Sequence, residues 1–257
     1  MGKIPVTACL LVKNEEDRLP RVLSSLSCFQ EILVFDSGSE DQSIKLCLDF
    51  EARVEQVPWE GFGATRKKLF SAVSSPWVFW IDADEVVTKE LAKELRALFA
   101  GKGPRHCGYL VNRIVRFQER WIRHGEWFPD WNLRLFRADS WSMEEVAVHE
   151  RVNLKVGKAE RLDGLLEHHT YRSWDDFQSR SDLYVSLWAQ EKMASGRNPF
   201  FLEGVLRASW KLFRAFILRG GFMEGMLGFR IARTNALEVY NKYKLLELLN
   251  KSTSSNV

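Results

Sequence analysis

The chain has 257 residues, of which 46% are hydrophobic and 28% charged, and its 37 Lys and Arg nearly balance its 34 Asp and Glu. This composition excludes disordered, collagen-like and disulfide-scaffold proteins. A chain of this length buries a large core without staples, so it can form one α/β domain, or such a domain with an appendage.

Cysteine use favours reduced thiols in the cytoplasm and gives no sign of structural zinc, because there is no C-x-x-C pair. The four cysteines are Cys9, Cys28, Cys47 and Cys107. The apolar segment 4–12 runs directly into charged residues without a small-residue cleavage site, so we interpret it as a buried strand. The longest uncharged stretch, 69–81, has 13 residues and is too short to span a bilayer.

The first third of the chain alternates predicted strands and helices. The predicted strands are short apolar runs at 6–12, 31–35, 53–57 and 77–81. The predicted helices have apolar residues at helical spacing and cover 17–26, 43–50 and 63–74. This alternation predicts an α/β fold with a mostly parallel sheet and helices on both faces.

Further strands are predicted around 109–111 and 133–136, where apolar residues alternate along the chain. From about Trp174 the pattern becomes helical and stays so to the C-terminus. We place the boundary between a catalytic domain, 1–199, and a helical tail, 200–257, near Pro199.

Acidic residues follow three of the predicted strands, where open α/β sheets bind their ligands. The sharpest pattern is Asp82-Ala83-Asp84, directly after the apolar run WVFWI. Two carboxylates at this spacing can approach one hard divalent cation, which commonly binds through one or two carboxylates and substrate phosphates. A solvated turn is the alternative interpretation.

The second pattern is Asp36-Ser37-Gly38-Ser39, which follows the second predicted strand. Gly38 permits a tight turn, and Asp36 can accept hydrogen bonds from a base or a ribose. The alternative is an Asx turn that leads into a helix cap at Ser39 or Asp41.

The ordered set LLVKNEE, FDSGSED, ATRKK and WVFWIDADE resembles glycosyltransferase family 2. The resemblance implies inverting enzymes of the GT-A fold, a Rossmann-like sheet with flanking helices, that use nucleotide-diphosphate sugars and Mg²⁺ or Mn²⁺. Three later segments, 125–136, 148–150 and 220–225, narrow it to lipopolysaccharide core β-glucosyltransferases of the WaaE/LgtF type. The resemblance covers nearly the whole chain.

The resemblance also implies roles for individual residues. Asp36 would contact the uracil, and Arg66, with its fork of donors, would approach the donor diphosphate. The family often has Asn directly after this arginine, whereas this chain has Lys67. Asp82 would contact the ribose or the metal, and Asp84 would ligate the metal. The donor-binding set is Val12, Asn14, Glu15, Asp36, Gly38, Arg66, Asp82 and Asp84.

The chemistry requires a metal to neutralise the diphosphate leaving group and a base to accept the proton of the acceptor hydroxyl. Asp130, which lies between aromatic residues that offer faces for a sugar, is the predicted base. A turn residue or an ion-pair partner of Arg134 is the alternative. His149 is the predicted third metal ligand, one that suits Mn²⁺ better than Mg²⁺, and His168 and His169 compete for the role.

The tail carries nine basic and four acidic residues, a charge of +5 that leaves −2 on residues 1–199. At 100° per residue, Arg207, Lys211 and Arg214 share one face of a helix. The apolar residues predicted on the opposite arc are Val205, Leu206, Trp210, Leu212, Phe213, Phe216 and Ile217. This distribution predicts contact with an anionic membrane, and packing on the catalytic domain is the alternative.

The sequence leaves open the transferred sugar, the linkage, the metal preference and the oligomeric state. The predicted function is transfer of glucose from UDP-glucose to an inner-core heptose of lipopolysaccharide, or to another glycolipid acceptor. The enzyme would be cytoplasmic and peripheral on the cytoplasmic face of the inner membrane, without a nucleic-acid partner. The alternatives are a family 2 glycosyltransferase with another donor sugar or with a polyprenyl- or protein-linked acceptor, and a non-catalytic membrane-surface module.

Overall fold

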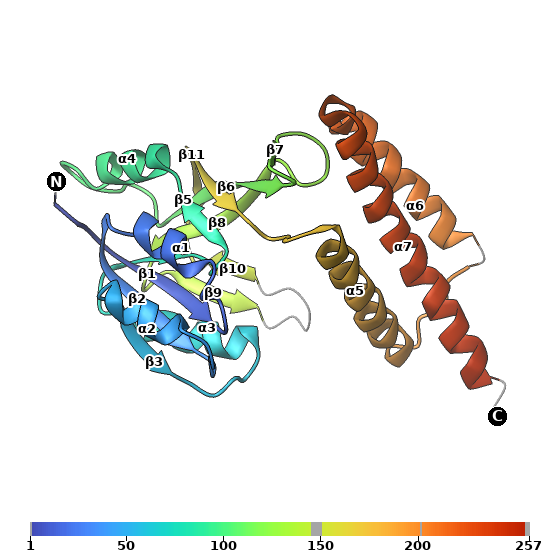
Figure 1. The fold of residues 1–257 in the computed structure, drawn as a ribbon, viewed down its shortest axis with the longest axis horizontal. Coiled ribbons are helices and arrows are strands. Elements are labelled where there is room, and N and C mark those ends of the chain that lie inside the picture. The colour runs from blue at the N-terminus through green and yellow to red at the C-terminus, as the bar shows by residue number, and fades with distance from the viewer. Residues whose placement is uncertain (1, 145–150, 201, 255–257) are drawn as a thin grey trace. The chain divides into compact units, whose positions relative to one another are not determined.

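The computed structural model describes residues 2–144, 151–200 and 202–254, which form two compact units. Unit 1 comprises residues 1–113 and 130–168, and unit 2 comprises 114–129 and 169–257. Figure 1 shows the elements of each unit.

The predicted parallel strands and their connecting helices are confirmed in unit 1. Strands β1 (Ile4–Val12), β2 (Phe29–Asp36), β3 (Arg53–Gln56) and β4 (Trp77–Trp80) lie in the order β3-β2-β1-β4, and all three neighbouring pairs are parallel. The connecting helices are α1 (Leu19–Ser25), α2 (Ser43–Asp49) and α3 (Phe62–Ser71).

Beyond β4 the sheet is extended by antiparallel pairs, so the whole sheet is mixed. Strand β8 (Asp130–Arg137) pairs with β4 and with β6 (Gly108–Phe117), and β11 (Glu160–His168) pairs with β5 (Glu85–Val87). Helix α4 (Lys89–Leu98) follows β5. A separate two-stranded sheet contains β9 (Trp141–Glu144) and β10 (Arg151–Leu154).

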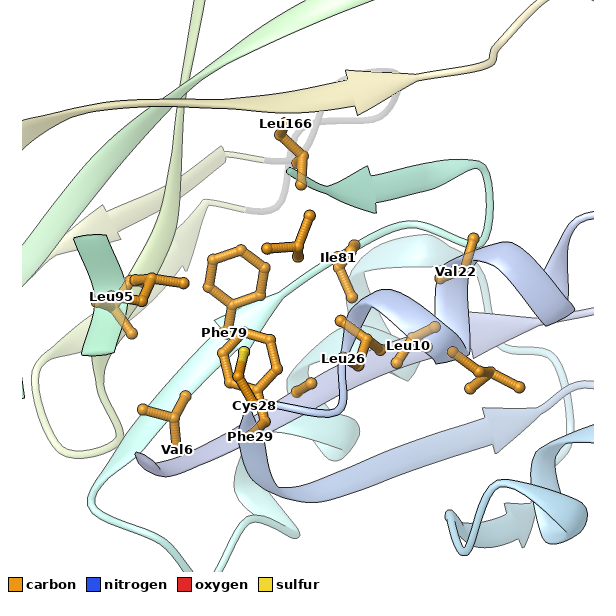
Figure 2. Close-up of a cluster of buried hydrophobic side chains, with 14 of the residues drawn as sticks. Val6, Leu10, Val22, Leu26, Cys28, Phe29, Phe79, Ile81, Leu95 and Leu166 are labelled. Atoms are coloured by element: carbon orange, nitrogen blue, oxygen red, sulfur yellow. The ribbon is translucent and has the colours of Figure 1, made fainter. Parts of the chain in front are cut away.

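Helices cover both faces of this sheet, as predicted. Side chains alternate along each strand, so neighbouring residues of one strand pack against helices on opposite faces. Leu10 of β1 belongs to a cluster with buried residues of α1, α2 and α4, whereas its neighbour Cys9 packs in a second cluster with Leu69 and Phe70 of α3. Figure 2 shows side chains of β1, β4, α1 and α4 meeting in the first cluster. The sheet edge that carries the strand-end acids is therefore held between two packed layers.

Unit 2 is mainly helical and contains α5 (Trp174–Ala194), α6 (Glu203–Phe213) and α7 (Gly225–Ser254). Helix α7 packs against both α5 and α6. The short strand β7 (Arg120–Ile122) pairs with the last residues of β6. None of the described helices has the length and apolarity needed to cross a bilayer.

The predicted α-helix through residue 217 is interrupted. Helix α6 ends at Phe213 and continues as a π-helical segment, Arg214–Leu218, which is followed by a 3₁₀ turn, Gly221–Glu224. The wider π-turn, closed by the Arg219 amide on the Arg214 carbonyl at 2.9 Å, changes the phase of the side chains. A spacing of 100° per residue therefore does not place Phe216 and Ile217, which lie within the π-helical segment.

The segment 220–225 is held inside unit 2 by hydrogen bonds of Glu224 and by a close backbone contact at Gly221. The buried carboxylate of Glu224 accepts a hydrogen bond from the Arg123 amide and lies 2.9 Å from Nδ1 of His124. The chain passes so close here that a Cβ on Gly228 would lie 2.0 Å from the Gly221 carbonyl oxygen. Glycine at this point therefore serves the packing of α7 against the turn.

The last division between the two units falls at 168/169, so α5 belongs to unit 2 and packs with α7 although it lies before residue 199. These units are defined by packing, whereas the predicted boundary at residue 199 is a functional one. The division into a catalytic domain, 1–199, and a tail, 200–257, therefore stays a prediction.

Candidate active site

A pocket of about 320 Å³ lies at the carboxyl ends of β1 and β2, in unit 1. Its lining includes Val12 and Glu15 from the predicted donor set, together with Ser37 from the loop that contains Asp36 and Gly38. Val12 is opposite Asp36 in the register of the two strands. The parallel pairing of β1 and β2 therefore brings two separate motifs to one place.

Asp36, which precedes the pocket residue Ser37, is 1% exposed and has one unpaired carboxylate oxygen. Its Oδ2 accepts hydrogen bonds from the amides of Gly38 and Ser39, at 3.0 and 3.1 Å, so the predicted Asx turn is present. Its Oδ1 is buried and has no hydrogen-bond partner among the described residues. A buried unpaired acceptor is costly, and an N–H donor of a ligand would satisfy it.

Gly38 is the residue of this loop that must be glycine. Its φ of 94° is strained for any other residue, and a Cβ there would meet no atom within 4 Å. The loop is thus left open above the turn, where a ligand can approach the backbone.

Asn14 supports this loop with its polar groups. The side-chain Oδ1 of Asn14 accepts a hydrogen bond from the backbone amide of Glu40 at 2.8 Å. The backbone amide of Asn14 donates to the hydroxyl of Ser39 at 2.9 Å. The amide of Glu15 donates to Ser43 at 2.8 Å. These bonds hold the segment after β1 against the segment after β2, which positions Glu15 on the pocket.

Two pocket residues were missed by the sequence analysis, Trp59 and Phe62. They are 47% and 55% exposed, and their rings pack edge to face with centroids 4.7 Å apart. The available signal was a pair of aromatic residues on either side of Gly61, at the start of the helix that carries Arg66. Exposed aromatic rings in the lining of this pocket offer a stacking surface for a planar base.

A series of ion pairs with alternating charge connects Arg66, which is predicted to bind the donor diphosphate, to Asp130, the predicted base. Asp82 accepts from Arg66 at 3.1 Å and from Arg134 at 3.0 Å. Arg134 also bonds to Glu85, which accepts from Arg113 at 3.1 Å, and Arg113 in turn bonds to Asp130. The order is Arg66, Asp82, Arg134, Glu85, Arg113 and Asp130, and all six belong to unit 1.

The arginines keep Asp82 ionised. Burial alone would raise the pKa of this carboxyl, but the charges of Arg134, Arg66 and Arg113 hold the pKa below its usual range. Arg66 itself lies over the rings of Trp80 and Phe62, at 4.6 and 5.0 Å from their centroids. The predicted arginine and the first acid of the D-x-D pair are therefore adjacent and fixed.

Asp130 is the first residue of β8 rather than part of a turn, and its ion-pair partner is Arg113 rather than Arg134. The distance from Arg113 Nη2 to Asp130 Oδ2 is 2.6 Å, and Asn132 donates to Oδ1 at 2.9 Å. Of the neighbouring aromatic residues, Trp131 has the guanidinium of Arg161 over its ring at 4.7 Å. Arg161 therefore covers the face of Trp131 that a sugar could otherwise stack on.

Asp84, the second acid of the pair, lies beside His168. The pairing of β5 with β11 places His168 opposite Glu85, and His168 Nε2 is 3.4 Å from Asp84 Oδ2. Burial raises the pKa of Asp84, but the hydrogen bond and charge of His168, with Arg18, outweigh this and lower it. Nδ1 of His168 is buried without a partner among the described residues.

The predicted metal ligand His149 lies outside the described residues. Within the described part of the chain, no three His, Cys, Asp or Glu side chains are arranged around a common point for a metal ion. Asp84 and His168 supply one oxygen and one nitrogen, a donor set that suits Mn²⁺, and such a cation commonly takes further ligands from substrate phosphates. The residues present therefore fit a metal that is completed by its substrate.

A model of family 2 glycosyl transferases matches residues 7–155, more than half of the chain. The chain belongs to glycosyl transferase family 2. The matched range contains Asp82 and Asp84, which follow β4, the pocket and Asp130. The α/β architecture of unit 1 confirms the predicted fold class. The activity of the family, transfer of a glycosyl group, is thereby that of this chain.

This chain is similar over nearly its whole length to the lipopolysaccharide core biosynthesis glycosyltransferase LpsC of Rhizobium meliloti. The identity is 27% over 95% of this chain and 94% of the relative. The chain is 24% identical to an uncharacterized glycosyltransferase of Rickettsia typhi, over 87% of this chain and 80% of the relative. A lipopolysaccharide core glycosyltransferase is thus among its relatives, as the predicted resemblance requires.

Two solved structures are also similar. Glucosyl-3-phosphoglycerate synthase of Mycobacterium tuberculosis, in complex with Mn²⁺ and UDP-glucose, has a TM-score of 0.35 and 26% identity over 44% of each chain. Residues 1–349 of TarS from S. aureus have a TM-score of 0.47 and 15% identity over 98% of this chain and 92% of that chain.

Proposed function

We propose that this glycosyltransferase is an inverting, metal-dependent hexosyltransferase that moves glucose from UDP-glucose to an inner-core heptose of lipopolysaccharide. One observation carries the donor assignment. A pocket at the ends of β1 and β2, a buried unpaired acceptor on the adjacent Asp36, and an arginine bonded to the first D-x-D acid belong to the same end of the sheet. The relative LpsC supports a lipopolysaccharide acceptor.

In this proposal the pocket binds the uridine. Asp36 Oδ1 accepts the imide N–H of uracil, which satisfies its buried acceptor, and Trp59 packs against the ring. Arg66 extends toward the diphosphate, while Asp82 holds its guanidinium in place. A bound Mn²⁺ or Mg²⁺ supplies neutralising charge to the leaving diphosphate.

Asp84 and His168 would hold the metal, with Asp82 adjacent and His149 retained from the sequence prediction as a further ligand. Asp84 has a lowered pKa, so its carboxylate is ionised at neutral pH and ready to bind a cation. Asp130 accepts the proton of the acceptor hydroxyl, and Arg113 fixes the direction of this carboxylate. The buried free cysteines fit a cytoplasmic enzyme, and we place it at the cytoplasmic face of the inner membrane.

The test measures sugar transfer and UDP binding in parallel. Asp130→Asn should abolish transfer from UDP-glucose to lipopolysaccharide that ends in inner-core heptose, while UDP binding stays unchanged. Asp139→Asn is the matched control, because Asp139 is an exposed carboxylate that is likewise paired with an arginine, Arg137. Near-normal turnover in Asp130→Asn would show that the base is another residue.

Metal and donor are tested separately. EDTA should stop transfer, and Mn²⁺ or Mg²⁺ should restore it; activity that persists after chelation would remove the role given to Asp84. A panel of UDP- and GDP-sugars, measured by thermal shift with and without Mn²⁺, checks the donor. Stronger stabilisation by a sugar nucleotide other than UDP-glucose would replace glucose in the proposal.

A further inference from the structure

A second pocket, of about 420 Å³, lies entirely within unit 2, between α5, α6, the π-helical segment and α7. Four of its lining residues are cations, namely Arg207, Lys211, Arg214 and Lys242, and none is acidic. The sequence prediction that the first three share a face is confirmed. Trp210 lines the same pocket, so its predicted place on the opposite arc is wrong.

Carboxylates of low exposure hold these cations in place. Glu126, with 15% of its side chain exposed, accepts from both Lys211 and Arg214 at 2.8 Å. Glu203, with 8% exposed, accepts from Arg207 at 2.7 Å. Glu238 accepts from the fourth cation, Lys242, at 2.6 Å. None of these three carboxylates lines the pocket, which leaves the charged residues of the lining all basic.

Aromatic rings form the remaining walls of the pocket. Trp188 and Tyr243 have ring centroids 5.0 Å apart, and Arg207 lies 5.6 Å from the Tyr243 centroid. Trp210 packs against Phe213 at 5.9 Å, and this contact joins the pocket to the outer surface of α6. Amphipathic rings of this kind are enriched where one end of a residue is apolar and the other is wet.

An exposed apolar strip lies on α6 and the π-helical segment, beside the pocket. Its residues are Val205, Leu206, Phe213 and Ile217, which are between 45% and 57% exposed. Apolar side chains next to clustered cations suit the interface of an anionic membrane.

We propose that this pocket binds the phosphate of an anionic phospholipid while the apolar strip enters the bilayer interface. A soluble phosphate compound would need the cations but not the strip, and a neutral lipid would need the strip but not the cations. The combination in one place favours an anionic lipid. This site is separate from the donor pocket and stands on residues of unit 2 alone.

The experiment uses the full chain and co-sedimentation with phosphatidylcholine vesicles, with or without phosphatidylglycerol. The double variant Lys211→Gln, Arg214→Gln should lose ~30-fold in partitioning to the anionic vesicles, since each basic residue near such a surface contributes about fivefold. The control is Arg233→Gln, Lys251→Gln, which removes two exposed charges of α7 outside the pocket and should change partitioning by less than about twofold. Equal losses in both variants would mean diffuse surface charge and would overturn the site.

A second pair of measurements separates the lipid from a soluble ligand. Phe213→Ser, Ile217→Ser should lose vesicle binding, whereas glycerol 3-phosphate should still protect this variant in a thermal shift assay. If glycerol 3-phosphate binds the wild-type protein but anionic vesicles do not, the occupant is a soluble phosphate compound and the lipid assignment is wrong. UDP binding in each variant reports on the donor pocket, so failure of that proposal would be seen separately.

Discussion

The buried centre of the series of ion pairs gives the most exacting prediction, the replacement of Arg134 by methionine. Arg134 is 1% exposed and bonds to Glu85, which is fully buried, and to Asp82. Removing one member of a buried ion pair leaves an uncompensated charge and costs about 3–5 kcal/mol. Both carboxylates keep a second guanidinium at 3.1 Å, from Arg113 and Arg66, so we expect the lower end of that range, about 3 kcal/mol.

The assay is equilibrium urea unfolding, in which the midpoint should fall while the slope stays the same. For a unit of this size, a loss of about 3 kcal/mol corresponds to a fall in Tm of roughly 6–12 °C. Arg137→Met is the matched control, because Arg137 lies on the same strand and pairs with Asp139 in solvent. Exposed pairs contribute little, so this variant should unfold like the wild type.

Equal midpoints for Arg134→Met and Arg137→Met would refute the reasoning, since burial would then make no difference to the pair. Arg134→Lys gives a further point. It keeps the charge but loses the fork that reaches two carboxylates, so its midpoint should lie between those of the wild type and Arg134→Met.

Three further predictions concern the pocket, the metal and unit 2. Asp36→Asn should weaken UDP binding roughly 10- to 100-fold in titration calorimetry, because it replaces a charged acceptor; unchanged affinity would mean that uracil binds elsewhere. His168→Ala should raise the Mn²⁺ concentration needed for binding, followed by electron paramagnetic resonance, by roughly tenfold or more, while His106→Ala, an exposed histidine of the same unit, should not. Burial raises the pKa of Glu203, but the hydrogen bond from Arg207 and the charge of Arg197 outweigh it and the pKa is lowered from 4.5. Its stabilisation is therefore present above about pH 4.5 and lost as pH falls through the lower folded value, so acid should shift the urea midpoint of the wild type more than that of Glu203→Gln.

The elements of unit 1 could be predicted because buried parallel strands are continuous apolar runs, as in VTACLLV and WVFWI. The residues after those runs could be predicted as site residues because parallel strands end at one edge. The partners of those residues could not, because they depend on the register of distant strands. His168 is 84 residues from Asp84 in sequence and reaches it only through the pairing of β11 with β5.

The same limit applies to Asp130 and to the tail. For Asp130, the nearby sequence offered Arg134 as an alternative ion-pair partner, but residues four apart in a strand are far from each other. The partner is Arg113, which lies opposite Asp130 on the adjacent strand β6. In the tail, the helical pattern was sufficient to group Arg207, Lys211 and Arg214. It could not show that α5 and α7 close the cavity in front of them.

The division of the chain into two units has a topological consequence. The backbone passes between them three times, after Arg113, before Asp130 and after His168, so each passage begins or ends at a residue of the candidate active site. Every path along the backbone from unit 2 into unit 1 therefore enters at the proposed base, at its arginine or at the histidine beside Asp84.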